Sequence, residues 1–130
     1  MDELTIGFPG GSKVDVHLDG LVVHTDQPVK DGGQGSAPTP SQLFLASIAS
    51  CAGYYALVFC QKRGIETQGM GLVMRLAKDD TTKLIRTMTL VLTLPDAFPE
   101  KYRPAILKAM DACWVKKHLV DPPRIEMVID

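Results

Sequence analysis

The stretch LFLASIASCAGYYALVFC, Leu43–Cys60, decides the fold of this chain. Its 18 residues are mostly apolar, and they lie within a longer segment without charge that runs from Gly32 to Gln61. The residues ahead of it, Thr39-Pro40-Ser41, are typical of a helix start, and Gly64 is typical of a helix end. We therefore predict one long helix over Leu43–Cys60.

A membrane-spanning helix is the alternative for this run. A span needs about 17–25 residues, and the 18 available are only moderately apolar because they include four alanines, two serines and a glycine. A helix that is apolar on all sides is also typical of the centre of a domain. We adopt that interpretation and expect no membrane partner.

Antiparallel strands are predicted on the N-terminal side of the helix. Residues 12–19 alternate between apolar and polar side chains, as a half-buried strand does. Asp19-Gly20 is a hairpin turn signal, so residues 21–25 form the return strand. Residues 4–8 give another short strand, and the glycine- and proline-rich residues 30–40 give a loop.

On the C-terminal side of the long helix, the sequence pattern predicts two more strands, a helix and a final strand. Alternation marks residues 72–77 and 84–94 as strands, and 124–130 as another. A second helix runs from about 104 to 119, with Pro122-Pro123 after it. The order predicts an α+β fold of antiparallel sheets, a long buried central helix and a second helix, in a single domain over residues 1–130.

Composition excludes several classes of protein. The chain has 130 residues, 45% of them hydrophobic and 22% charged, which excludes a disordered chain. A net charge of -1 and a pI near 6.3 give no basis for nucleic-acid binding. The acidic start lacks a secretory signal, so we expect a cytoplasmic protein whose three cysteines are free thiols.

The cysteines are the candidates for chemistry, because the three histidines have no metal-binding spacing and no cofactor motif is present. Cys60 lies half a helical turn out of phase with Cys51 and about 13 Å along the axis, so the two cannot meet. We interpret Cys60 as structural. Cys113 lies on the apolar stripe of the second helix, with Lys116 and Lys117 about one turn further on.

Two readings of Cys51 and Cys113 stay open from the residues alone. Each can be a small core side chain, as buried cysteines usually are. If the two helices pack together, the thiols can instead face each other and reduce a peroxide. One thiolate is then oxidised to sulfenic acid, and the second condenses with it to a disulfide.

Two segments resemble the OsmC/Ohr family, the osmotically inducible protein C and organic hydroperoxide reductase family. Residues 37–51, APTPSQLFLASIASC, resemble the segment that leads into the peroxidatic cysteine on the family's central helix. Residues 112–119, ACWVKKHL, resemble the segment around the resolving cysteine. The separation of 62 residues between Cys51 and Cys113 is similar as well, and the resemblance covers essentially the whole chain.

The resemblance implies an intertwined homodimer with active sites at the subunit interface. Cys51 would be the peroxidatic and Cys113 the resolving cysteine, with an organic hydroperoxide as substrate and a dithiol reductant such as a lipoyl group. No metal or organic cofactor is implied. Phe44, Tyr54 and Tyr55 would either line a pocket for the peroxide tail or pack in the core.

The chain departs from the family at the groups that activate the thiol. The hydroperoxide reductases use an Arg from an N-terminal strand, held by a Glu ten residues before the cysteine. Here that position is Ser41, and no arginine precedes Arg63. The upstream candidates are lysines and histidines: Lys13, Lys30, His17 and His24. Without a cation, a cysteine in mid-helix should have an ordinary or raised pKa.

Three functions therefore follow from the sequence. The first is a cysteine-dependent peroxidase, favoured by the two motif cysteines. The second is a non-enzymatic dimeric protein that binds a small molecule or senses redox state, favoured by the missing Arg and Glu. The third is disulfide exchange, or attack by the thiol pair on another electrophile.

Overall fold

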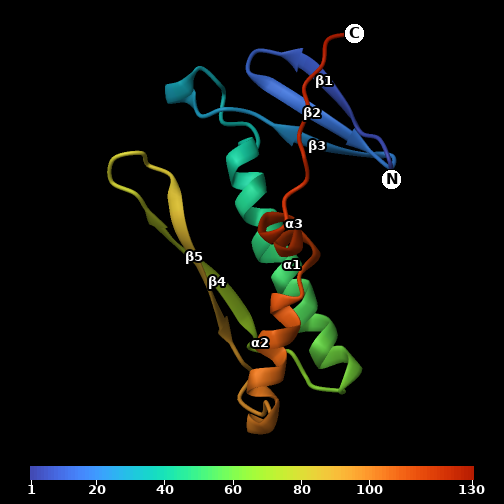
Figure 1. Cartoon of the computed structure of the whole chain (residues 1–130), viewed down its shortest axis with the longest axis vertical. Helices are drawn as coiled ribbons and strands as arrows, with labels where there is room; N and C mark the ends of the chain where they lie inside the picture. The colour runs from blue at the N-terminus through green and yellow to red at the C-terminus, as the bar shows by residue number, and fades with distance from the viewer. The chain divides into compact units, whose positions relative to one another are not determined.

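The computed structural model describes residues 1–130 (Figure 1). The chain forms two compact units, Met1–Ala46 and Ser47–Asp130, and each is described by itself. All neighbouring strands in the two sheets pair antiparallel, and helices make up most of the remaining regular structure. The α+β class predicted from the sequence is confirmed.

A three-stranded antiparallel sheet dominates the first unit. Its strands are β1 (Thr5–Gly10), β2 (Lys13–Leu18) and β3 (Leu21–Thr25), in that order across the sheet. The β2–β3 turn has positive φ at both central residues, 44° at Asp19 and 76° at Gly20. This is the backbone that the Asp-Gly signal predicts for a two-residue hairpin.

A buried carboxylate organises the loop that follows β3. Asp26 is 1% exposed. It accepts hydrogen bonds from the hydroxyl of Ser36 at 2.6 Å and from the backbone N–H groups of Ser36, Gln27 and Gln34 at 3.1, 2.8 and 3.2 Å. These bonds, led by the Ser36 hydroxyl, lower the pKa of Asp26 to about 2. The glycine-rich segment is therefore an ordered loop, which includes a short 3₁₀ turn, η1 (Val29–Asp31).

Helix α1 (Pro40–Lys62) begins at a reciprocal cap. The backbone N–H of Thr39 donates to the side chain of Gln42 at 2.9 Å, and the N–H of Gln42 donates to the Thr39 hydroxyl at 3.2 Å. Such a capping box satisfies donors that the first turn leaves unpaired. The helix ends at Lys62, and Gly64 follows it with a φ of 63°, which allows the N–H of Ile65 to reach the carbonyl of Cys60 at 3.0 Å.

The predicted long helix is therefore confirmed, with two or three further residues at each end. By length and composition alone α1 is also able to cross a membrane, a test that core helices of soluble proteins pass as well. Within the single chain one face of it is buried, through Ile48, Ala52, Ala56, Phe59 and Cys60.

The second unit contains the hairpin of β4 (Gly71–Lys78) and β5 (Ile85–Thr93). Its register pairs Leu72 with Leu92, Met74 with Leu90, and Leu76 with Met88 across the strands. This apolar row is the face predicted from the alternation. Leu72, Leu90 and Leu92 pack against the core formed by α1 and the helices that follow.

The predicted helix over residues 104–119 is wrong in one respect, because it consists of two helices. After a 3₁₀ turn, η2 (Glu100–Tyr102), α2 covers Arg103–Asp111 and α3 covers Trp114–Val120. The break falls at Cys113, whose ψ of 128° is extended. Cys113 is consequently the N-cap of α3 and does not lie within a helix.

The strand predicted at residues 124–130 is absent from the single chain. These residues have no regular structure, and Ile125, Met127 and Ile129 are 80%, 93% and 99% exposed. The two strands of the second unit pair only with each other. A strand forms only against an edge that supplies hydrogen-bonding partners, and the alternating sequence finds none here.

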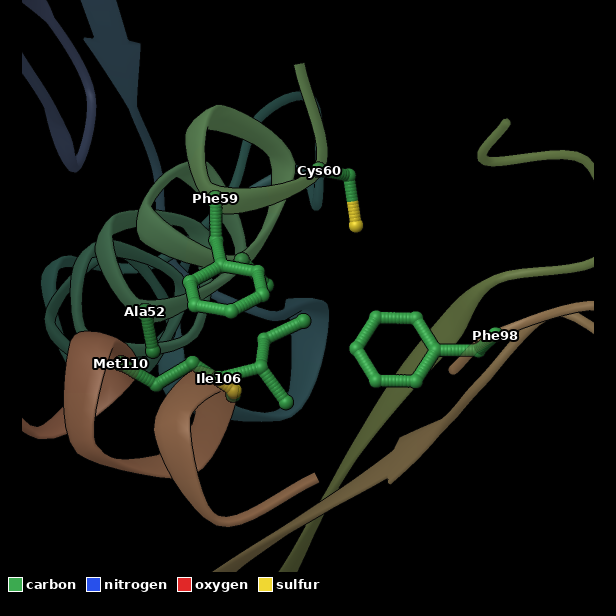
Figure 2. Close-up of a cluster of buried hydrophobic side chains, with 7 residues drawn as sticks. Ala52, Phe59, Cys60, Phe98, Ile106 and Met110 are labelled. Atoms are coloured by element: carbon green, nitrogen blue, oxygen red, sulfur yellow. The ribbon is translucent and has the colours of Figure 1, made fainter. Parts of the chain in front are cut away.

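The core of the second unit lies between α1, α2 and the segment after β5. Figure 2 shows Phe59 of α1 and Ile106 of α2 pointing toward each other, with Phe98 approaching from the opposite side. Ile106 is fully buried, and the rings of Phe59 and Phe98 have centroids 6.4 Å apart. This packing fixes α2 against α1, and thereby fixes the position of the cysteine that follows α2.

Candidate functional site: a pair of cysteines on two helices

The structure brings Cys51 and Cys113 together. Cys51 lies in the middle of α1 and is half-buried, whereas Cys113 is 1% exposed at the junction of α2 and α3. Both are free thiols, and they lie close enough together for each to shift the pKa of the other. Both residues belong to the second unit.

The pKa of Cys51 lies below its ordinary value. Burial acts to raise it, but hydrogen bonds from the Cys113 thiol and from the backbone N–H groups of Val115 and Trp114 outweigh burial. The expectation of an ordinary or raised pKa for Cys51 is therefore wrong. That expectation was based on cations and on the dipole of α1, whereas the N–H groups that lower the pKa belong to the first turn of α3.

The pKa of Cys113 is shifted in the opposite direction. Burial raises it, and the neighbouring Cys51 raises it further, while the N–H groups of Lys116 and Val115 act the other way. The pair is therefore unequal, with the pKa of Cys51 lowered and the pKa of Cys113 raised. A thiolate beside a thiol is the arrangement in which one sulfur attacks an electrophile and the other follows.

A pocket of about 400 Å³ opens beside Cys113. Its walls are mostly apolar side chains from α1, β5, α2 and α3, and Asp111 and Lys116 form its polar part. The apolar lining consists of Ile48, Ala52, Met88, Leu90, Leu107, Met110, Leu119 and Val120. Lys116 forms an ion pair with Asp111.

The aromatic residues considered for the pocket are not among its lining. Tyr54 is 61% exposed and Phe44 is exposed, so neither is a core residue of the single chain. Tyr54 and the half-buried Tyr55 contact each other edge to face, with centroids 5.9 Å apart. The pocket is aliphatic instead, and the sequence analysis missed it because its residues come from four separate elements.

Cys60 lies apart from the pair, as its position along α1 predicts. It is fully buried in the core, with its sulfur 4.0 Å from that of Met70. Burial raises the pKa of Cys60, and the charge of Arg63 offsets this only in part. A protonated, enclosed thiol of this kind acts as a small core side chain.

The basic residues that precede α1 are all in the first unit, at Lys13, His17, His24 and Lys30. His24 is paired there with Asp15 at 2.9 Å. The groups that lower the pKa of Cys51 are hydrogen-bond donors of the second unit. No metal-binding cluster of His, Cys, Asp and Glu is present.

Solved structures similar to this chain share its fold. A Psychrobacter arcticus protein, described as a candidate osmotic stress induced and detoxification response protein, is 20% identical over 90% of this chain and 87% of that chain, with a TM-score of 0.73. An OsmC-like protein from Mycoplasma pneumoniae is 15% identical over 94% and 91%, with a TM-score of 0.70. An organic hydroperoxide resistance protein OsmC from Legionella pneumophila is 21% identical over 92% and 90%, with a TM-score of 0.55.

No curated protein matches the sequence. The OsmC-like protein family matches residues 33–128, which include the whole of α1, both cysteines of the pair and the pocket beside Cys113. The match covers most of the chain and agrees with the fold of the similar structures. The chain belongs to the OsmC-like protein family.

Proposed function

We propose that this protein is a thiol-dependent peroxidase that reduces organic hydroperoxides, with Cys51 as the attacking and Cys113 as the resolving cysteine. The observation that carries the proposal is the contact between two thiols whose pKa values are shifted in opposite directions. Membership of the OsmC-like family supports it, as does the likeness to a Legionella protein described as an organic hydroperoxide resistance protein.

The proposed reaction has two steps. The Cys51 thiolate attacks one oxygen of the hydroperoxide, the O–O bond breaks, and an alcohol leaves after taking up a proton. Cys51 is then a sulfenic acid. The Cys113 sulfur attacks the sulfur of Cys51, the S–O bond breaks and water leaves, so that a disulfide joins the two residues. The substrate gains two electrons and the cysteine pair loses two.

Activation of Cys51 does not require the family's arginine in this account. The backbone N–H groups of Trp114 and Val115 and the Cys113 thiol stabilise the anionic sulfur. Backbone amides supply partial positive charge at a fixed position, as hydrogen bonds to an anion do elsewhere. This mechanism fits a chain with Ser41 where the hydroperoxide reductases have glutamate.

Return of the disulfide to two thiols needs an external dithiol, for which the family resemblance favours a lipoyl group. A dithiol donates two hydrogens and is itself oxidised to a disulfide, so the electrons balance. No metal or organic cofactor takes part in this cycle.

We further propose that the protein is a homodimer and that both units act as one OsmC-like domain over residues 1–130. Large apolar side chains stay exposed in the single chain, among them Phe8 at 81%, Leu21 at 66% and Ile129 at 99%. Extensive exposed apolar surface is typical of an interface. A second copy offers strand edges to the alternating segment 124–130, which pairs with no strand of its own chain.

We assign α1 to the core of a soluble cytoplasmic protein rather than to a membrane. The support is its packing against α2 and β5 in the apolar core, and the three free cysteines, which suit a reducing compartment.

The test is removal of cumene hydroperoxide in the presence of dihydrolipoamide by the wild type, Cys51→Ser, Cys113→Ser and Cys60→Ala. We expect Cys51→Ser to lose turnover and Cys113→Ser to stop at the sulfenic acid after a single reaction. The buried-cysteine control, Cys60→Ala, should keep its activity. Turnover by Cys51→Ser equal to that of the wild type would contradict the assignment.

Two other functions remain as outcomes of this test. A protein whose thiols do not react with peroxide, but whose pocket binds an apolar molecule, would be the dimeric binding protein. A protein that exchanges rapidly with small disulfides and not with peroxides would be a thiol–disulfide oxidoreductase.

A further inference from the structure

The two helices that meet at Cys113 are held in place in different ways. Helix α2 is anchored in the core of the second unit by Ile106 and Met110. Helix α3 contains no buried residue, and the chain beyond it has no regular structure. Core packing therefore fixes α2 but not α3. The direction in which α3 leaves the junction depends on contacts at the junction itself.

One ion pair closes across this junction. The carboxylate of Asp111, the last residue of α2, pairs with the ammonium group of Lys116 in the first turn of α3. Cys113 lies between the two charged residues in the sequence, at the break in the helix. The ion pair therefore ties the end of one helix to the beginning of the next, across the residue that separates them.

The groups that face Cys51 all come from this short junction. Cys113 is 1% exposed and precedes α3 directly, and the N–H groups of Trp114 and Val115 reach the sulfur of Cys51. Cys51 itself lies on α1. A change in the direction of α3 therefore displaces three successive residues relative to Cys51. Reaction rates fall steeply when reacting groups are displaced by as little as about 1 Å.

We propose that the ion pair between Asp111 and Lys116 is a positioning device that holds Cys113 and the residues after it against Cys51. This inference rests on the proposed function, in which Cys113 must reach a sulfenic acid on Cys51. The side chains of Lys116 and Asp111 are 47% and 67% exposed. Exposed ion pairs contribute little to global stability, so removal of this one loosens the junction and leaves the fold intact.

The sign of the effect at Asp111 distinguishes positioning from direct electrostatics. A carboxylate that acts directly on a nearby thiol disfavours the thiolate, so its removal would make the thiol more reactive. Removal of the Lys116 ammonium group would have the opposite effect. Positioning predicts instead that the loss of either partner slows the joining of the two sulfurs. Asp111→Asn is therefore the decisive variant.

The test measures how fast diamide joins Cys51 to Cys113 in protein that carries Cys60→Ala. Diamide takes two electrons and two protons from the thiol pair and leaves a disulfide, which is followed by acid quenching and peptide mapping. We expect Asp111→Asn and Lys116→Gln each to slow this reaction by about two- to fivefold, which is the range that an exposed ion pair supports. Salt at about 1 M, which shortens the screening length to about 3 Å, should bring the wild type close to the variants.

Matched controls remove the same charges from neighbouring positions. Lys117→Gln and Asp121→Asn alter α3 and the residue after it, and neither residue forms an ion pair. Both controls should react at nearly the wild-type rate, and so should Lys116→Arg, which keeps the ion pair. A rate that rises or stays unchanged in Asp111→Asn overturns the proposal. A loss in Lys117→Gln as large as that in Lys116→Gln overturns it as well.

A second readout separates this inference from the function on which it rests. With cumene hydroperoxide and dimedone, a larger share of Cys51 should be trapped as sulfenic acid in Asp111→Asn, because Cys113 competes less well. A disulfide that forms with diamide but not with hydroperoxide contradicts the peroxidase, and the diamide rates still decide the role of the ion pair. Failure of diamide to join Cys51 and Cys113 in the wild type overturns both.

Discussion

The contact between the Cys113 thiol and Cys51 predicts a measurable change in the acidity of Cys51. Replacing Cys113 with alanine removes the side-chain donor but leaves the N–H groups of Trp114 and Val115 in the backbone. Replacing it with serine keeps an O–H donor at the same position. The two variants therefore differ mainly in one hydrogen bond to the sulfur.

The expected size of the effect follows from the energy of that bond. A hydrogen bond to a charged group stabilises it by about 1.5 kcal/mol. Since about 1.4 kcal/mol corresponds to a tenfold change in protonation equilibrium, the thiolate population of Cys113→Ala should be about tenfold lower at a given pH below the midpoint. The more basic thiolate is also more nucleophilic, with a Brønsted coefficient of about 0.4–0.5, so alkylation should slow by only about threefold.

The assay is the pH dependence of iodoacetamide alkylation at Cys51, followed by peptide mass spectrometry, with thiolate absorbance as a second readout. The midpoint should move to higher pH in Cys113→Ala and stay near that of the wild type in Cys113→Ser. A midpoint unchanged in Cys113→Ala would refute the thiol–thiol contact. Equal shifts in both variants would show that packing, and not hydrogen bonding, is responsible.

Three predictions concern the fold that supports the site. In the folded chain the pKa of Asp26 is lowered from 3.8 to about 2. Its stabilising contribution is therefore present above pH 4 and is lost as the pH falls toward 2. The difference in thermal midpoint between the wild type and Asp26→Asn should shrink over that range. Gly33→Ala places a Cβ in steric clash with the carbonyl oxygen of Gln27, so urea unfolding should show a loss of about 1–3 kcal/mol, whereas Gly71→Ala, where nothing lies within 4 Å, should cost less. Ile106→Ala empties a fully buried site and should lower the urea unfolding free energy by about 2–5 kcal/mol; a loss below 1 kcal/mol would contradict the core described here.

Local sequence signals predict much of this fold. Charge-free, capped residues mark α1, and Asp19-Gly20 marks the first hairpin, because helix caps and positive-φ turns depend on residues close together in the chain. The row of leucines and methionines on β5 identifies its buried face for the same reason.

The break between α2 and α3 is not visible in the sequence. No glycine or proline occurs at Ala112-Cys113, and the apolar spacing continues through it. Ile106 and Met110 of α2 pack in the core ahead of the break, and such tertiary contacts cannot be deduced from the local spacing of apolar residues. The pKa of Cys51 was mispredicted as a consequence. The backbone N–H groups that lower it, from Trp114 and Val115, are free of helical partners only because a separate helix, α3, begins at this point.

For the C-terminal segment, the sequence pattern predicts the type of structure but not its pairing partner. Alternation in residues 124–130 indicates that they can form a strand, but the pattern contains no information about which edge would pair with it. In the single chain no edge does. Removing this segment and measuring the oligomeric state by light scattering should yield a monomer; a dimer that persists would assign the interface to other surfaces.

The most direct test of the account is the state of the thiols after an equimolar amount of cumene hydroperoxide. Intact mass and peptide mapping of the wild type should show the loss of two hydrogens and a peptide that joins Cys51 to Cys113, formed rapidly, with Cys60 still reduced. The Cys113→Ser variant should instead hold a sulfenic acid on Cys51. Three unchanged thiols over many minutes would contradict the peroxidase and leave a binding protein with an unequal pair of cysteines.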